Sequence, residues 1–177
     1  MKLLRETLVA KLREQGIQYL APSDAEATEL IATNDALITA LLEQTDSRLK
    51  LAVIPLLIRH PELAGSVPAL VNQLDGQLAI EMKTLYMAAV YLQRLWKTRL
   101  SFYLNSTPLL PDLFSQQLGL PSPDERYGKF GLYDLADAWK ARSPYPFDRL
   151  TALNNTMDLF FEQLKIEQRA TQHAPTS

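Results

Sequence analysis

The sequence predicts an all-α protein, a helical bundle with a long central helix and a proline-rich ordered crossover. Three observations favour this fold. Leucines and other apolar residues recur every three or four positions in most segments, which is the period of an α-helix. The segment Gly76–Leu104 carries two such apolar rows side by side. The composition, 47% hydrophobic and 21% charged, is typical of a globular domain.

The first helix is expected from Lys2 to Gln15, where Leu4, Leu8 and Leu12 recur at helical spacing and Gly16 follows as the stop. The S-x-x-E pattern of residues 23–26 is a capping box that should begin the next helix.

Asn34 allows two interpretations. It either interrupts the helix that the capping box begins, or caps a second piece that carries Leu37, Ile38, Leu41 and Leu42. The pattern does not separate these alternatives.

Asp46 is a plausible N-cap for a helix from Ser47 to Arg59. Pro55 lies inside this helix and should kink it, because proline lacks the N–H and its ring crowds the preceding turn. The apolar run Leu51–Ile58 could instead be a buried strand, but every neighbouring segment is helical, so we expect a helix.

A turn over residues 60–65 and a short helix from Ser66 to Leu74 lead to the longest element, Gly76–Leu104, with Asp75 as its cap. The first apolar row consists of Leu78, Met82, Leu85, Ala89, Leu92, Trp96, Arg99 and Tyr103. The second consists of Thr84, Ala88, Tyr91, Leu95, Thr98 and Phe102. Together the two apolar rows make a face too wide for one partner helix to cover, so this helix should lie at the centre of the bundle.

Residues 105–127 contain four prolines and Gly119, yet they are too apolar for a free linker. We expect an ordered crossover that packs on the bundle, with a short helix from Asp112 to Leu118.

Two helices should complete the domain. Gly131–Lys140 turns Leu132, Leu135, Ala136 and Trp139 inward. After a rigid turn at residues 143–146, Asp148 should cap a last helix that runs to about Arg169. Its inward stripe is Leu153, Met157, Phe160, Phe161 and Leu164. The chain is thus expected to be a single helical domain over residues 1–170 with a flexible tail at 171–177.

The composition and net charge of the chain exclude several classes of function. A net charge of −2 does not suit a whole-domain nucleic-acid binder. The absence of cysteine excludes thiol catalysis, disulfides and cysteine-ligated zinc. We expect no cofactor and no metal. No apolar run approaches the length of about 18 residues that a membrane span needs, and the first residues lack a signal-peptide pattern, so a cytoplasmic location is expected.

Few residues suggest catalysis, and we assign no catalytic residue. Arg59 and His60 could serve RNA cleavage, but the pair is better explained as a cationic helix end before Pro61. Asp134 and Asp137 could share a metal, but a solvated helix face is the better explanation of this pair.

Two features suggest binding of an anion. Arg94, Lys97 and Arg99 form a basic patch near Trp96 that could contact phosphate or RNA, with a solvated helix edge as the simpler explanation. The G-x-x-G of residues 128–131 could bind an anion at a helix N-terminus, but a turn with Gly131 at the cap accounts for it without a ligand.

The crossover is the best candidate for a functional surface. Leu109, Leu110, Leu113 and Phe114 exceed what a surface connector needs, and long ordered loops are often functional. We predict that these four residues form an interaction surface for another protein chain or for a second copy. The alternative is that they turn inward and cap one end of the bundle.

Three stretches resemble a group of uncharacterised bacterial helical proteins encoded beside minimal nucleotidyltransferases. These are residues 86–96 (YMAAVYLQRLW), residues 110–115 with 118–121 (LPDLFS and LGLP), and Tyr127-Gly128 with Gly131-Leu132. The resemblance spans residues 46 to 165. It implies a helical partner in a two-component, toxin-antitoxin-like pair. It transfers no catalytic residue, and the R-x4-6-H motif of helical ribonuclease toxins is absent.

The favoured hypothesis is therefore a non-enzymatic helical interaction or regulatory module, which could be the partner of a small nucleotidyltransferase. One rival is an enzyme, either ribonuclease-like or built on carboxylates. Another is a small-ligand binder with a pocket between helices, lined by Tyr86, Tyr91, Trp96 and Trp139.

Overall fold

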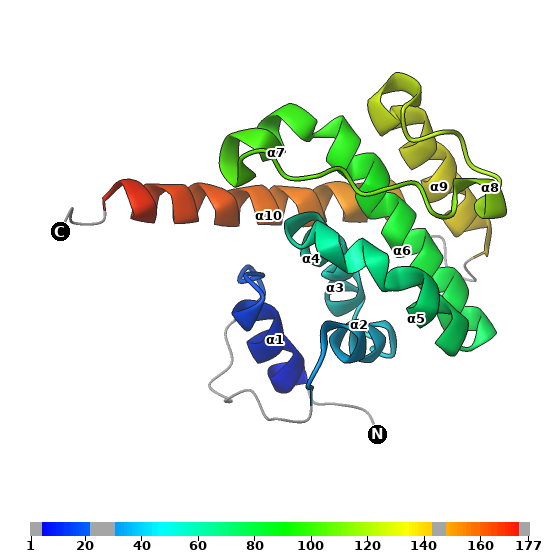
Figure 1. Ribbon diagram of the computed structural model, residues 1–177, viewed down its shortest axis with the longest axis horizontal. Coiled ribbons are helices and arrows are strands. Elements are labelled where there is room, and N and C mark those ends of the chain that lie inside the picture. The colour runs from blue at the N-terminus through cyan, green and yellow to red at the C-terminus, as the bar shows by residue number, and fades with distance from the viewer. Residues whose placement is uncertain (1–4, 22–30, 143–147, 174–177) are drawn as a thin grey trace.

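The computed structural model describes residues 5–21, 31–142 and 148–173, and every regular element in these ranges is a helix (Figure 1). The predicted all-α class is confirmed. The α-helices are α1 (Arg5–Glu14), α2 (Asn34–Leu42), α3 (Ser47–Leu51), α4 (Val53–Arg59), α5 (Val67–Gln73), α6 (Gly76–Leu95), α7 (Lys97–Leu104), α8 (Ser115–Leu118), α9 (Lys129–Arg142) and α10 (Arg149–Gln172). Two 3-10 helices, η1 (Pro61–Gly65) and η2 (Glu125–Gly128), complete the list. None of the described helices is long and apolar enough to cross a membrane.

The core forms where α4 and α6 pack on each other. Every residue from Thr84 to Gln93 of α6 is buried, and so is every residue from Leu51 to Ile58 around α4. Helices α2, α4, α5 and α9 all contact α6. A helix that is buried on every side needs apolar residues on every side, which explains the two rows in its sequence.

The segment around Pro55 is helical, so the strand alternative for residues 51–58 is wrong. The helix breaks at Ala52, between α3 and α4, three residues before Pro55, although Ala52 itself keeps helical angles of φ −64° and ψ −16°. The position of the break follows from proline geometry, because Pro55 cannot donate to the carbonyl of Leu51, four residues earlier, and its ring crowds that carbonyl. Asp46 caps α3 by accepting from the Arg48 N–H at 2.9 Å, as predicted.

The long helix is not continuous to Leu104, which corrects the prediction. It breaks at Trp96, whose backbone leaves the helical region at φ −105° and ψ 19°. Beyond the break, Trp96 packs edge-on against Phe161 of α10 with 5.7 Å between ring centroids, and Tyr103 lies 6.4 Å from the same ring. The change of direction thus lays α7 along α10, as Figure 1 shows, while Phe102 stays 67% exposed.

The ends of several helices agree with the local signals. Gly16 ends α1 in the left-handed region at φ 83°. Thr33 rather than Asn34 caps α2, through a 3.1 Å bond from the Ala36 N–H, so the second piece predicted there exists with its cap one residue earlier. Asp75 and Asp148 cap α6 and α10 as predicted. The expected capping box at residues 23–26 and the turn at 143–146 lie outside the described residues.

Helix α10 continues to Gln172, into the expected tail (Figure 1). The five residues of its predicted inward stripe are all buried. Glu167 accepts two bonds from the Arg59 guanidinium, at 3.0 and 3.1 Å. Gln163 donates to Glu167 and to the Gly16 carbonyl and accepts from the Gln18 N–H, each at 2.7 Å. One buried amide therefore joins α10 to the end of α1.

We expect Gln163→Ala to lower the free energy of unfolding by about 2–4 kcal/mol, because it removes the partners of the Gln18 N–H and the Gly16 carbonyl together. Urea denaturation followed by circular dichroism measures this loss. Gln168→Ala, on the same helix, is the control and should change stability by less than about 0.5 kcal/mol. Equal effects of the two variants would contradict the role given to Gln163.

Candidate functional site

The crossover is held by polar side chains of α6. The Tyr86 hydroxyl donates to the Pro111 carbonyl at 2.7 Å, and the Tyr91 hydroxyl donates to the Pro121 carbonyl at 2.8 Å. Gln93 donates to the Pro108 carbonyl and accepts from the Leu110 N–H, at 2.9 and 2.7 Å. Burial raises the pKa of both phenols above its usual range, so both remain donors at neutral pH. These bonds satisfy backbone groups that an irregular segment cannot pair by itself.

The predicted interaction surface on the crossover is corrected by this arrangement. Leu110 is completely buried and Phe114 is only 5% exposed, with its ring edge-on to Tyr86 at 5.6 Å. Leu113 is half-buried, and Leu109 is 40% exposed. The four residues therefore do not share one exposed face. Fixing the crossover backbone against α6 turns Leu110 and Phe114 into the core, which was the alternative left open.

Both arginines of the predicted basic patch make contacts within the fold. The Arg94 side chain is 12% exposed and lies 3.3 Å from Asp124. Its guanidinium also donates to the Leu110 carbonyl at 3.0 Å. Arg99 lies over the Phe161 ring, 4.0 Å from its centroid, and Lys97 and Arg99 are both exposed. Arg94 and Arg99 therefore both have roles in packing the helix ends and the crossover.

The other residues considered for catalysis or metal binding lie at a helix end or on an exposed helix face. His60 ends α4, with Nε2 2.7 Å from the Gln15 carbonyl and Nδ1 3.3 Å from Glu62, in agreement with its interpretation as a helix end. Asp134 and Asp137 are exposed on α9. Within the described ranges, no group of three or more His, Cys, Asp or Glu residues is placed to hold a metal.

The two glycines of the G-x-x-G pattern serve close packing. Gly131 is the third residue of α9 rather than its cap, which corrects the prediction. A Cβ at Gly131 would lie 2.0 Å from the Tyr91 ring, and a Cβ at Gly128 would lie 2.5 Å from the Tyr91 carbonyl. Gly128 also has φ 82°. The glycines thus let η2 and α9 lie directly on α6.

The outer side of this packed turn carries three exposed aromatic residues. Tyr127 is 80% exposed, Phe130 47% and Tyr133 44%. Arg126 lies 5.6 Å from the Phe130 ring centroid, and Lys129 lies 6.0 Å from that of Tyr133. We call these five residues the aromatic face. Sequence reasoning missed it, although aromatic residues spaced three apart and out of phase with the inward stripe of α9 were a readable signal.

The backbone under the aromatic face is unusual. Arg126 and Tyr127 both have left-handed conformations, at φ 47° and 57°. Each costs about 1–2 kcal/mol for a residue with a Cβ, and such backbone strain concentrates at functional sites. Here the left-handed backbone directs the Tyr127 side chain toward solvent at the start of α9.

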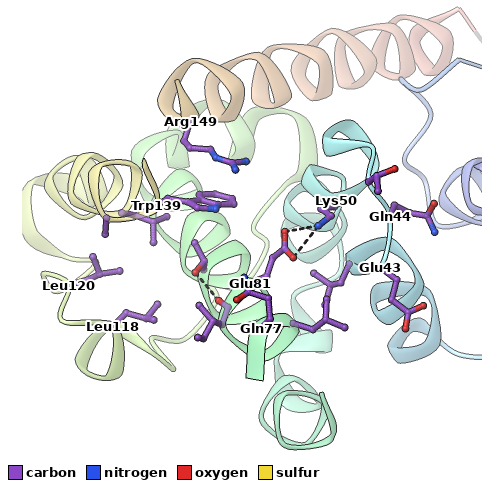
Figure 2. Close-up of a pocket in the computed structure, with 16 residues that line it drawn as sticks. Glu43, Gln44, Lys50, Gln77, Glu81, Leu118, Leu120, Trp139 and Arg149 are labelled. Atoms are coloured by element: carbon purple, nitrogen blue, oxygen red, sulfur yellow. Dashed lines mark hydrogen bonds and ion pairs between the residues drawn. The ribbon is translucent and has the colours of Figure 1, made fainter. Parts of the chain in front are cut away.

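A separate cleft of about 610 Å³ lies between α3, the first turns of α6, α8, α9 and the start of α10 (Figure 2). Lys50 pairs with Glu81 at 3.1 and 3.2 Å across it, and the Arg149 guanidinium lies 4.5 Å from the Trp139 ring centroid. Of the four aromatic residues predicted to line a ligand pocket, Trp139 does so here. Tyr86 and Tyr91 are completely buried, and Trp96 packs on Phe161.

Comparison with known proteins found no matching family model, no matching curated protein and no matching solved structure.

Proposed function

We propose that the chain is a non-enzymatic helical interaction module that binds another protein through the aromatic face. The observation that carries this proposal is the exposure of Tyr127, Phe130 and Tyr133 on a backbone packed against the central helix. Aromatic residues and arginine are enriched in the energetically dominant part of protein interfaces. A rigid presentation lowers the entropy lost on binding.

The charges beside the rings indicate the chemistry of the partner. Arg126 and Lys129 lie beside Phe130 and Tyr133, and Glu125 and Asp134 are exposed next to them in the sequence, so the aromatic face carries charges of both signs at its edge. The complementary surface is an apolar segment with polar and charged residues at its rim. The acidic total of the chain favours a protein over a nucleic acid.

The residues that could have supported an enzyme are engaged in the fold. His60 joins α4 to the end of α1, and Arg94 holds the crossover. These engagements favour the interaction hypothesis over a ribonuclease. The resemblance to helical partners of minimal nucleotidyltransferases makes such an enzyme, encoded in the neighbouring gene, the first partner to test.

The test is the double variant Tyr127→Asn with Phe130→Ser. Asparagine tolerates the left-handed backbone of position 127, so the fold should be kept. Removing two central aromatic anchors should weaken association at least about thirtyfold, since one such anchor is worth about 2 kcal/mol or more. Calorimetry with the neighbouring gene product and sedimentation velocity of the chain alone separate a partner from self-association.

The matched control is Ile166→Ser, which removes a side chain that is 64% exposed on α10, away from the aromatic face. It should leave binding unchanged. The proposal fails if the double variant binds as tightly as the parent, or if the parent remains monomeric and binds neither itself nor the neighbouring product. A parent that binds single-stranded RNA while the double variant does not would replace the protein partner with a nucleic acid.

A further inference from the structure

The solvent side of α10 carries two largely exposed apolar residues. Leu159 is 47% exposed and Ile166 is 64% exposed. They lie seven residues apart, which is about two helical turns, so both are on one side of the helix, opposite its buried stripe. The C-terminal part of α10 extends beyond α7 (Figure 1). We call Leu159 and Ile166 the apolar pair of α10.

Four charged residues flank the apolar pair, all on the same side of it by helical spacing. In chain order they are Asp158, Glu162, Lys165 and Arg169. Among the residues that the structure describes, none of these four makes an ion pair. The other charged residue of this stretch, Glu167, is paired with a residue of α4. The exposed face of α10 is thus acidic in its first half, basic in its second half and neutral in sum.

The same face of a second copy, turned antiparallel, complements this order of charges. A helix rises 1.5 Å per residue, and a two-fold axis level with the midpoint between Glu162 and Lys165 brings each of these two level with the other in the second copy. Asp158 then lies level with Arg169 of the second copy. All four charges of each helix thereby face a charge of opposite sign.

The apolar pair fits the same arrangement. Leu159 comes within about 3 Å, measured along the helix axis, of the level of Ile166 in the second copy, so the two side chains can pack at the centre of the contact. A parallel arrangement would instead place each charged residue opposite its own copy, where like charges repel. The order of charges therefore selects the antiparallel orientation.

We propose that the exposed face of α10 binds a second copy of this chain, with the two helices antiparallel. About four turns of one helix offer less contact than the roughly 1,200 Å² of a stable interface, so the dimer should dissociate at concentrations on the order of micromolar. The contact uses other residues than the aromatic face, so it stands or falls independently of the proposed protein partner.

Charge reversal, followed by sedimentation equilibrium of the whole chain, tests the proposal. Asp158→Lys should weaken dimerisation about tenfold, because it turns attraction into repulsion at two symmetry-related contacts. Arg169→Glu should do the same. The two substitutions together restore opposite charges in reversed order, and that variant should dimerise within about threefold of the parent. Lys140→Glu, on the exposed side of α9, makes a matched change of charge and should have no effect.

Circular dichroism melting confirms that each variant is folded before sedimentation. The reversed positions are exposed, so the fold should be kept. A parent that is monomeric at about 100 μM would overturn the proposal, since even a weak dimer forms there. Single reversals that dimerise like the parent, or a combined variant no better than the single reversals, would overturn it as well.

A second comparison separates this contact from the aromatic face. The double variant Tyr127→Asn with Phe130→Ser should dimerise like the parent. Ile166→Ser should dimerise about tenfold more weakly, since it removes half of the apolar pair, while its calorimetric affinity for the neighbouring gene product stays that of the parent. The opposite result, a dimer lost in the aromatic double variant and kept in Ile166→Ser, would place self-association on the aromatic face and overturn the proposal.

Disulfide trapping tests the orientation, because the chain has no cysteine of its own. A disulfide needs Cα atoms within about 7 Å, which the antiparallel pair allows between positions 159 and 166 but not between two copies of either position. Under mild oxidation, a mixture of Leu159→Cys and Ile166→Cys chains, one of them tagged, should form the mixed disulfide, and each chain alone should form little. Faster trapping of either variant with itself would contradict the antiparallel contact.

Discussion

Leu110→Glu is expected to lower the free energy of unfolding by about 4–6 kcal/mol, since it replaces a completely buried leucine with a carboxylate. Leu110 lies where the crossover is fastened to α6, and its N–H and carbonyl are bonded by Gln93 and Arg94. The new charge would lie among apolar side chains. For a chain of this length, each kcal/mol shifts the melting temperature by about 2–4 °C, so a fall of at least about 10 °C should be seen by circular dichroism.

Leu109→Glu is the matched control, because the neighbouring leucine is 40% exposed. The same change there should alter the free energy of unfolding by less than about 1 kcal/mol. A Leu110→Glu protein that melts with the parent would mean that the crossover does not pack on α6, and the interaction surface first expected from the sequence would regain its support.

Gly131→Ala is expected to destabilise the protein by about 2–4 kcal/mol, although alanine is the better helix former by about 1 kcal/mol. The added methyl would lie 2.0 Å from the Tyr91 ring, which is fully buried and held by its bond to the Pro121 carbonyl. Neither α9 nor α6 has room to move away without opening the core. Urea denaturation measures the effect.

Two further variants test whether the clash with the Tyr91 ring causes the loss of stability. Gly76→Ala, at the first position of α6 where no atom lies within 4 Å of the added Cβ, should be neutral or stabilising by up to about 1 kcal/mol. In a Tyr91→Leu background the Gly131→Ala substitution should lose its cost, because the ring that opposes the methyl is absent. If Gly131→Ala remains equally costly without the Tyr91 ring, the clash is not its cause.

The local elements could be read from the sequence. Capping by Asp46, Asp75 and Asp148, the stop at Gly16 and the inward stripe of α10 depend on residues within a turn or two of each other, and the structure confirms them. The break between α3 and α4 before Pro55 has the same local origin, a missing N–H and a crowded carbonyl. The all-α class followed from the same short-range periodicity.

The candidate sites could not be read in that way. Whether an apolar residue of an irregular segment faces inward depends on which distant groups hydrogen-bond to the backbone of that segment. In the crossover, Tyr86 and Gln93 make these bonds, and Leu110 and Phe114 are buried as a result. The partners of two arginines also come from distant parts of the chain, since Arg94 contacts Leu110 and Asp124 and Arg99 lies over Phe161 of α10. Charged side chains from α3, α6 and α10 meet in the cleft only through the packing of these helices.

By itself, then, the sequence determined the helices, most of their ends and the residues of the central buried row, because spacing, caps and prolines act over a few residues. The tertiary structure alone decided which face of the crossover is buried, why Gly128 and Gly131 are glycines, that the aromatic face is exposed, and that Lys50, Glu81 and Arg149 line one cleft. Those outcomes depend on contacts between residues far apart in the chain, and a one-dimensional pattern does not encode which of its many apolar and polar groups will meet.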